Sequence, residues 1–282
     1  MSNSYANILT SAADFAVNSY ISPKYAKLDR KIKAPGTPLP AAFTIWTPIF
    51  LGRIAYGFLK DKDRSLESSN WNHAISATGL TYAGALASER YYSMEVAMLA
   101  MTYASYKYRD SLPESDSTSA KAVAFAAELG FGWLLAADGL ISAKNKQRLA
   151  GRKFTHAEQD IVGVGQAVLA AGGAIAANHL KGWSGTSVSA AWALGAIALD
   201  KRSEKHVRTI AAATAVGVLA DLAFTTLQRS RSSVIDSRAK DGLKSPNGFS
   251  DTLPLSNRTL GSRTKRVRDS RLSRSDASLR NN

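Results

Sequence analysis

The chain of 282 residues has 36 lysines and arginines against 22 acidic residues, a formal net charge of +14, and no cysteine. This length allows one large domain or two small ones. The lack of cysteine excludes disulfides, iron–sulfur clusters and zinc sites with thiolate ligands. Before Lys24 there is no basic side chain and there is one acidic residue, Asp14. We therefore expect neither a secretory signal nor a transit peptide.

The positive charge is concentrated at the C-terminal end. From Arg229 onwards there are 13 basic and 5 acidic residues, a net charge of +8, so the first 228 residues carry only +6. The region 229–282 is rich in serine and arginine and poor in aromatic residues. We expect a body, 1–228, followed by a disordered or extended basic tail, 229–282.

Apolar segments follow one another along the body, and nearly all of them are longer than ordinary strands. Thr155 and Glu158 have the spacing of a capping box, which predicts a helix start. Basic loops are expected at 22–36 and 144–153. The sequence predicts an all-α bundle of about seven to eight helices, over residues 4–21, 39–58, 68–88, 91–108, 120–143, 182–199 and 207–228, with one more that starts at the capping box and contains the uncharged segment 161–180.

Several of these segments are long enough to cross a membrane. Residues 68–88 and 161–180 contain no charge, and about 20 apolar residues span the hydrocarbon core. Their many glycines and alanines suit close helix packing in lipid. Against this, the mean hydropathy of the chain is −0.14, and Glu95, Asp221 and other acidic residues interrupt the segments. We predict a multi-pass membrane bundle, and an alanine-rich soluble bundle stays open as the alternative.

The most aromatic segment is 39–58, in which Arg53 is the only charge. Phe43, Trp46, Phe50 and Arg53 recur at spacings of three and four, which puts them on one side of a helix. Pro48 lies within this segment, and we expect it to kink the helix because it removes a backbone donor.

Three stretches resemble a known family. Residues 40–52 (PAAFTIWTPIFLG) look like the second-helix signature of the tryptophan-rich sensory proteins, which are relatives of the translocator (TspO/MBR) family. Residues 129–137 (LGFGWLLAA) are similar to a later helix of that family, and 191–195 (AWALG) is a weaker match. The resemblance covers roughly residues 10–228. It implies a helical membrane protein that binds a tetrapyrrole or a sterol and catalyses no reaction.

Two groups of residues are candidates for a site. The resemblance implies that Phe43, Trp46, Phe50 and Trp133 line a pocket for a flat hydrophobic ligand, whereas composition alone favours ordinary packing between helices. The second group is ionisable. Ionisable residues inside a membrane helix need a partner, so Arg53 is predicted to pair with Glu128 or Asp138 across the bundle. The alternatives are that Arg53 reaches a nearby interface, or that all three are surface charges of a soluble protein.

Catalytic and metal sites are not predicted. The four histidines, His73, His156, His179 and His206, are never three or four residues apart, so no helical face offers two of them to a metal. Axial haem ligation by His73 or His179 stays a remote alternative. The glycines of 163–168 follow a capping box and no strand, which excludes a dinucleotide-binding turn. The chain has no nucleophile motif or phosphate-binding loop.

In the tail, one cluster of cations stands out. Arg263, Lys265, Arg266 and Arg268 could contact anionic lipid, an acidic partner protein or nucleic-acid phosphates. We carry three hypotheses forward. The first is a ligand-binding membrane protein, the second a structural or assembly subunit docked through its tail, and the third a soluble helical protein that binds nucleic acid. The sequence leaves a homo-oligomer open in each of them.

Overall fold

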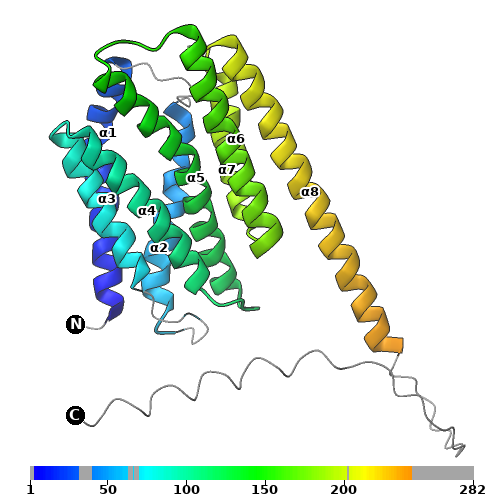
Figure 1. Ribbon diagram of the computed structural model, residues 1–282. Coiled ribbons are helices and arrows are strands. Elements are labelled where there is room, and N and C mark those ends of the chain that lie inside the picture. The colour runs from blue at the N-terminus through cyan, green and yellow to red at the C-terminus, as the bar shows by residue number, and fades with distance from the viewer. Residues whose placement is uncertain (1–2, 32–39, 63–65, 67–69, 202, 243–282) are drawn as a thin grey trace, which may run out of the picture. The chain divides into compact units, whose positions relative to one another are not determined.

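The computed structural model describes residues 3–31, 40–62, 66, 70–201 and 203–242. This part of the chain is all-helical and contains no strand, which confirms the predicted fold class (Figure 1). Eight α-helices and one short 3₁₀ helix, η1, are present among the described residues. Their bounds are α1 Asn3–Lys31, η1 Pro40–Ile45, α2 Trp46–Leu59, α3 Trp71–Ala87, α4 Tyr91–Ser111, α5 Thr118–Leu149, α6 His156–Lys181, α7 Ser184–Leu199 and α8 Lys205–Gly242.

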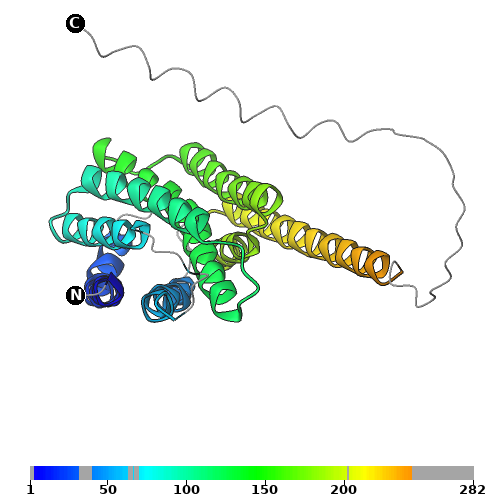
Figure 2. The same cartoon turned by 90° about the horizontal axis from the view of Figure 1, so that it is seen from below.

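Consecutive helices run in alternating directions, joined at the two ends of the bundle (Figure 1). Helix α5 lies in the middle and packs against α2, α4, α6 and α7 (Figure 2). Helix α1 packs along α2 and α3. Contacts divide the chain into two units, 1–233 and 234–282. The first unit holds all of the described bundle, including the part of α8 up to Ser233.

The helix ends differ from the predictions at both termini, and α5 also continues past 143 to Leu149, into the predicted basic loop 144–153. Helix α1 continues past Ile21, through Pro23, to Lys31, so the predicted basic loop begins inside a helix. Helix α8 continues past Gln228 to Gly242. Charged sequence resembles disordered sequence in composition, but lysine, arginine and alanine also have good helix propensity, so composition does not say where such a helix ends. The rest of the predicted tail, 243–282, lies outside the described residues.

The aromatic segment is divided in two instead of forming one kinked helix. Residues Pro40–Ile45 form the 3₁₀ turn and α2 begins at Trp46. Pro48 therefore lies in the first turn of α2, where a backbone N–H has no intrahelical acceptor to lose. The proline sets the start of α2 and does not bend its middle.

Two hydrophobic cores lie on opposite sides of α5. Leu134 and Ile141 belong to the core shared with α2, α3 and α4. Leu129 and Trp133 belong to the core shared with η1, α6, α7 and α8. Trp46 packs against both cores. The junction of the two cores, at Trp46 and α5, is therefore the centre of the bundle.

Large apolar side chains remain exposed along the middle of many helices. Among them are Leu51 on α2, Leu99 on α4, Leu169 on α6 and Leu219 on α8. Four helices of the described chain are long and apolar enough to cross a membrane, over Ala41–Leu59, Thr118–Leu149, His156–Lys181 and Lys205–Ser233.

Helix α1 has its polarity reversed relative to a helix of a water-soluble protein. A polar stripe faces the bundle and is buried, consisting of Ser4, Asn7, Ser11 and Asp14. Apolar side chains point outward, with Tyr5 64%, Leu9 57% and Tyr20 89% exposed. Asp14, the one acidic residue before Lys24, is therefore inside the bundle.

Candidate ligand cavity

A cavity of about 340 Å³ lies between the two cores. Residues from η1 and from α1 to α7 line it, and most of them are apolar or aromatic. All four aromatic residues predicted to form a pocket contribute to its wall: Phe43, Trp46, Phe50 and Trp133. The volume is in the range of small-molecule sites, roughly 300–1,000 Å³.

The aromatic rings of this wall contact one another. Phe43 and Trp133 meet edge to face with ring centroids 5.4 Å apart. Trp46 and Phe50 have centroids at the same separation, and Phe15 of α1 packs on Phe50 at 5.2 Å. Because Trp133 is only 2% exposed, its ring is fixed by packing on several sides. The result is a rigid wall of rings suited to a flat apolar molecule.

The cavity has an exposed side. Three of its lining residues, Phe15, Ser19 and Thr47, are exposed, whereas Met98, Leu140 and the other lining residues of α4 and α5 are largely covered. The exposed residues lie on α1 and at the start of α2. The part of the cavity lining that reaches the surface is therefore on these two helices.

The polar part of the wall includes Asp14 and Asn18, one turn apart on α1. Asn18 Nδ2 donates to the backbone oxygen of Asp14 at 2.9 Å and to Asp14 Oδ1 at 2.7 Å. Asp14 Oδ2 accepts from Arg53 Nη1 at 2.6 Å. Asp14 is the only charged residue among the described residues that line the cavity, and Arg53 compensates its charge.

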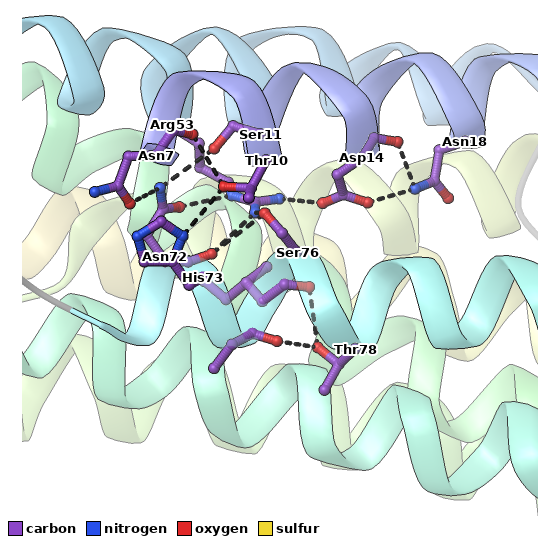
Figure 3. Close-up of polar contacts among 12 residues, drawn as sticks. Asn7, Thr10, Ser11, Asp14, Asn18, Arg53, Asn72, His73, Ser76 and Thr78 are labelled. Carbon is purple, nitrogen blue, oxygen red and sulfur yellow. Dashed lines mark hydrogen bonds and ion pairs between the residues drawn. The ribbon is translucent and has the colours of Figure 1, made fainter. Parts of the chain in front are cut away.

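Arg53 is the centre of a buried polar network that joins α1, α2 and α3 (Figure 3). Its Nε donates to Asn72 Oδ1 at 2.9 Å, and its Nη2 donates to the backbone oxygen of Asn72 and to Ser76 Oγ. Asn72 in turn donates to Asn7 Oδ1 at 3.0 Å and Ser11 Oγ at 3.2 Å on α1. The guanidinium also lies over the Phe50 ring, 5.6 Å from its centroid. One arginine thereby ties three helices to the aromatic wall.

The predicted pairing of Arg53 with Glu128 or Asp138 is replaced by other partners. Arg53 pairs with Asp14. Glu128 pairs with Arg109 at 2.8 Å and accepts from the backbone nitrogen of Gly185, at the start of α7. Asp138 accepts from Thr102 on α4 at 2.8 Å. The spacing along one helix identifies which charges lie in the bundle, but the partner depends on which helices become neighbours.

The inward-facing acids share one property. Besides Asp14, Glu128 and Asp138, Glu95 accepts from Ser142 and Asn145 of α5, and Asp221 accepts from Asn178 of α6. Each acidic residue in the middle of a described helix thus has a hydrogen-bonding partner on a neighbouring helix or an adjacent turn.

The two histidines considered as haem ligands, His73 and His179, are not among the residues that line the cavity. His179 contacts Asp221 across α6 and α8, and His73 contacts Thr10 of α1. Within the described part of the chain, no group of three or more histidine and acidic side chains could hold a metal ion. The basic cluster of Arg263, Lys265, Arg266 and Arg268 lies outside the described residues.

The sequence analysis missed Asn18 and the role of Asp14. Their signal was present in the spacing of Asn7, Ser11, Asp14 and Asn18, which repeats every three or four residues as an inner helical face does.

Comparison with known proteins places the chain in no group: no family model, no curated protein and no solved structure matches it.

Proposed function

We propose that the chain is a multi-pass membrane protein that binds a hydrophobic ligand in the cavity between its helices, without turnover. The observation that carries this proposal is the cavity itself, at the junction of the two cores and walled by aromatic rings. The resemblance to the tryptophan-rich sensory proteins suggests the same kind of function, with a tetrapyrrole or a sterol as its ligand.

The distribution of polarity supports the membrane part of the proposal. In water, large exposed apolar patches are rare on a monomer, and buried polar residues are costly unless they are bonded. Here apolar side chains face outward on many helices, while the acids within the helices face inward and are hydrogen-bonded. Such an arrangement is favourable when the surroundings are hydrocarbon. It also disfavours the soluble nucleic-acid-binding alternative.

Extraction of membranes with alkaline carbonate tests this part. We expect the full-length protein, expressed in cells, to remain in the membrane pellet and to need detergent for release. Release into the carbonate supernatant would refute the membrane assignment, because peripheral proteins are removed by this treatment and embedded helices are not.

Equilibrium binding to the purified protein tests the ligand. The probe is radiolabelled methoxynaphthalene, a flat uncharged bicyclic molecule, with excess unlabelled probe to subtract partition into detergent. We expect saturable binding, weakened about tenfold by Trp46→Leu because one aromatic contact is lost. The matched control is Trp71→Leu, since Trp71 packs on Tyr103 of α4 and does not line the cavity. Lack of saturable binding, or equal losses in the two variants, would refute the ligand site.

A second candidate function is a structural subunit of a membrane complex. It is favoured by α8, which buries Val207, Ala211 and Val218 against the core while leaving Phe224 and Leu227 exposed. The basic tail that follows could dock on an acidic partner. Co-purification under mild detergent separates the two candidates, because an assembly subunit migrates with its complex and a ligand carrier migrates alone or as a homo-oligomer.

A further inference from the structure

The orientation of the Asn18 amide is fixed by its neighbours. Its nitrogen makes two hydrogen bonds to oxygens of Asp14 (Figure 3). In the flipped orientation the amide oxygen would face those two acceptors and repel them. The amide oxygen therefore points away from Asp14, as Figure 3 shows, on a side chain that lines the cavity. Of the two polar atoms of this lining side chain, the oxygen is therefore the one that the contacts with Asp14 leave available.

The charges around this acceptor exclude an anionic ligand group. Asp14 is a carboxylate, and the nearest cation, Arg53, already donates to Asp14, Asn72 and Ser76 from all three of its guanidinium nitrogens. No basic residue of the described chain lines the cavity. An anion placed there would meet two oxygen acceptors and no free cation, in surroundings where an unpaired charge is costly.

A cationic group is also disfavoured. The charge of Asp14 is already compensated by Arg53 at 2.6 Å, so an incoming ammonium would add an unpaired positive charge beside a guanidinium. An uncharged O–H or N–H donor needs no counter-ion and satisfies the amide oxygen directly. The exposed side of the cavity, between apolar Phe15 and the start of α2, suits entry of an uncharged molecule from lipid.

We propose, given that the cavity binds a ligand as stated above, that the ligand is a flat uncharged molecule with a hydrogen-bond donor, which bonds to Asn18 Oδ1. The aromatic wall holds its apolar body, and Asn18 sets its orientation. Tetrapyrrole acids, which carry carboxylates, are then disfavoured as ligands, although the resemblance implies them. A cavity of about 340 Å³ lies at the small end of the range of small-molecule sites, roughly 300–1,000 Å³.

Three probes of one shape test the ligand chemistry on the full-length protein. Naphthol has the donor, methoxynaphthalene lacks it, and naphthoate carries a negative charge. We expect naphthol to bind about three- to tenfold more tightly than methoxynaphthalene, in line with one net hydrogen bond. We expect naphthoate to bind more weakly than either. Equal binding of naphthol and methoxynaphthalene, or tightest binding of naphthoate, would overturn the inference and leave the ligand site intact.

The variant Asn18→Leu removes the acceptor. We expect the preference for naphthol over methoxynaphthalene to disappear. The ratio of two probes on one sample does not depend on the fraction of folded protein, and Asn18→Ala gives a second, smaller replacement. An unchanged ratio in both variants overturns the role of Asn18. If no probe binds the wild-type protein saturably, the ligand site itself is refuted.

Discussion

Replacing Arg53 by methionine should strongly destabilise the bundle. The change keeps most of the apolar length of the side chain but removes the guanidinium and its bonds to Asp14, Asn72 and Ser76. It leaves the Asp14 carboxylate, whose side chain is only 2% exposed, without its counter-ion. Breaking a buried pair in this way costs about 3–5 kcal/mol, which is a large share of the roughly 5–15 kcal/mol that stabilises a typical domain.

The assay is equilibrium unfolding of the purified protein by increasing SDS in mild detergent, followed by tryptophan fluorescence. The matched control is Arg152→Met, because Arg152 forms a similarly short pair with Glu158, at 2.7 Å, on the exposed end of the bundle. We expect the control to change stability far less, since exposed pairs are screened by solvent.

A double variant separates the charge from the packing. Asp14→Leu combined with Arg53→Met removes both charges, and buried pairs replaced by apolar residues are often close to neutral. We expect the double variant to be more stable than Arg53→Met alone. If Arg53→Met unfolds at the same SDS fraction as Arg152→Met, the network does not hold α1 on α2 and α3, and the reasoning is wrong.

Two further predictions concern the helix contacts and the C-terminal region. A Cβ at Gly132 would lie 2.5 Å from the backbone oxygen of Thr186, so Gly132→Ala should destabilise the protein by about 1–3 kcal/mol in the same SDS unfolding assay, whereas Gly165→Ala, with open space around it, should not. Equal effects of the two alanines would contradict the close packing of α5 and α7. Deletion of 234–282 should leave the thermal midpoint within about two degrees but weaken binding to phosphatidylserine vesicles, and full-length binding should weaken with added salt. Outright unfolding of the truncated protein, or binding and salt dependence like those of the full chain, would refute a separate basic tail.

The number and order of the helices could be predicted from the sequence because the determining signals are local. Long uncharged segments such as 161–180, and the capping box of Thr155 and Glu158, need no tertiary information, and the structure contains both features. The ends of α1 and α8 could not be predicted in the same way. Composition alone does not separate a charged helix from a disordered segment, so both ends were placed too early.

Part of the cavity wall could also be predicted, because the spacing of its aromatic residues is a local signal. Phe43, Trp46 and Phe50 follow one helical stripe, and they share a cavity wall. The partner of Arg53 was not predictable, because an arginine on α2 can reach any inward-facing acid on a neighbouring helix. That choice depends on α1 lying against α2 and α3, where the small residue Gly79 leaves room for Asp14. No spacing within a single helix contains this information.

Helix α1 shows why hydropathy summed along a segment is a poor guide for this chain. Its polar and apolar residues cancel in an average, so it is not among the four helices that qualify as spans by composition. The sides of the helix to which these residues point do differ, because the polar side chains face the bundle and the apolar ones face outward. Burying Asn7, Ser11 and Asp14 while exposing Leu9 and Tyr20 is unfavourable in water, since the apolar side chains gain nothing and the polar ones must be desolvated. In hydrocarbon the same arrangement is favourable, since apolar side chains can face outward and polar side chains are better placed inside the bundle, where they bond to one another. The low mean hydropathy of the chain comes largely from its charged and serine-rich region 229–282. Within the body, polar residues such as Asn7, Ser11 and Asp14 are used in contacts between helices.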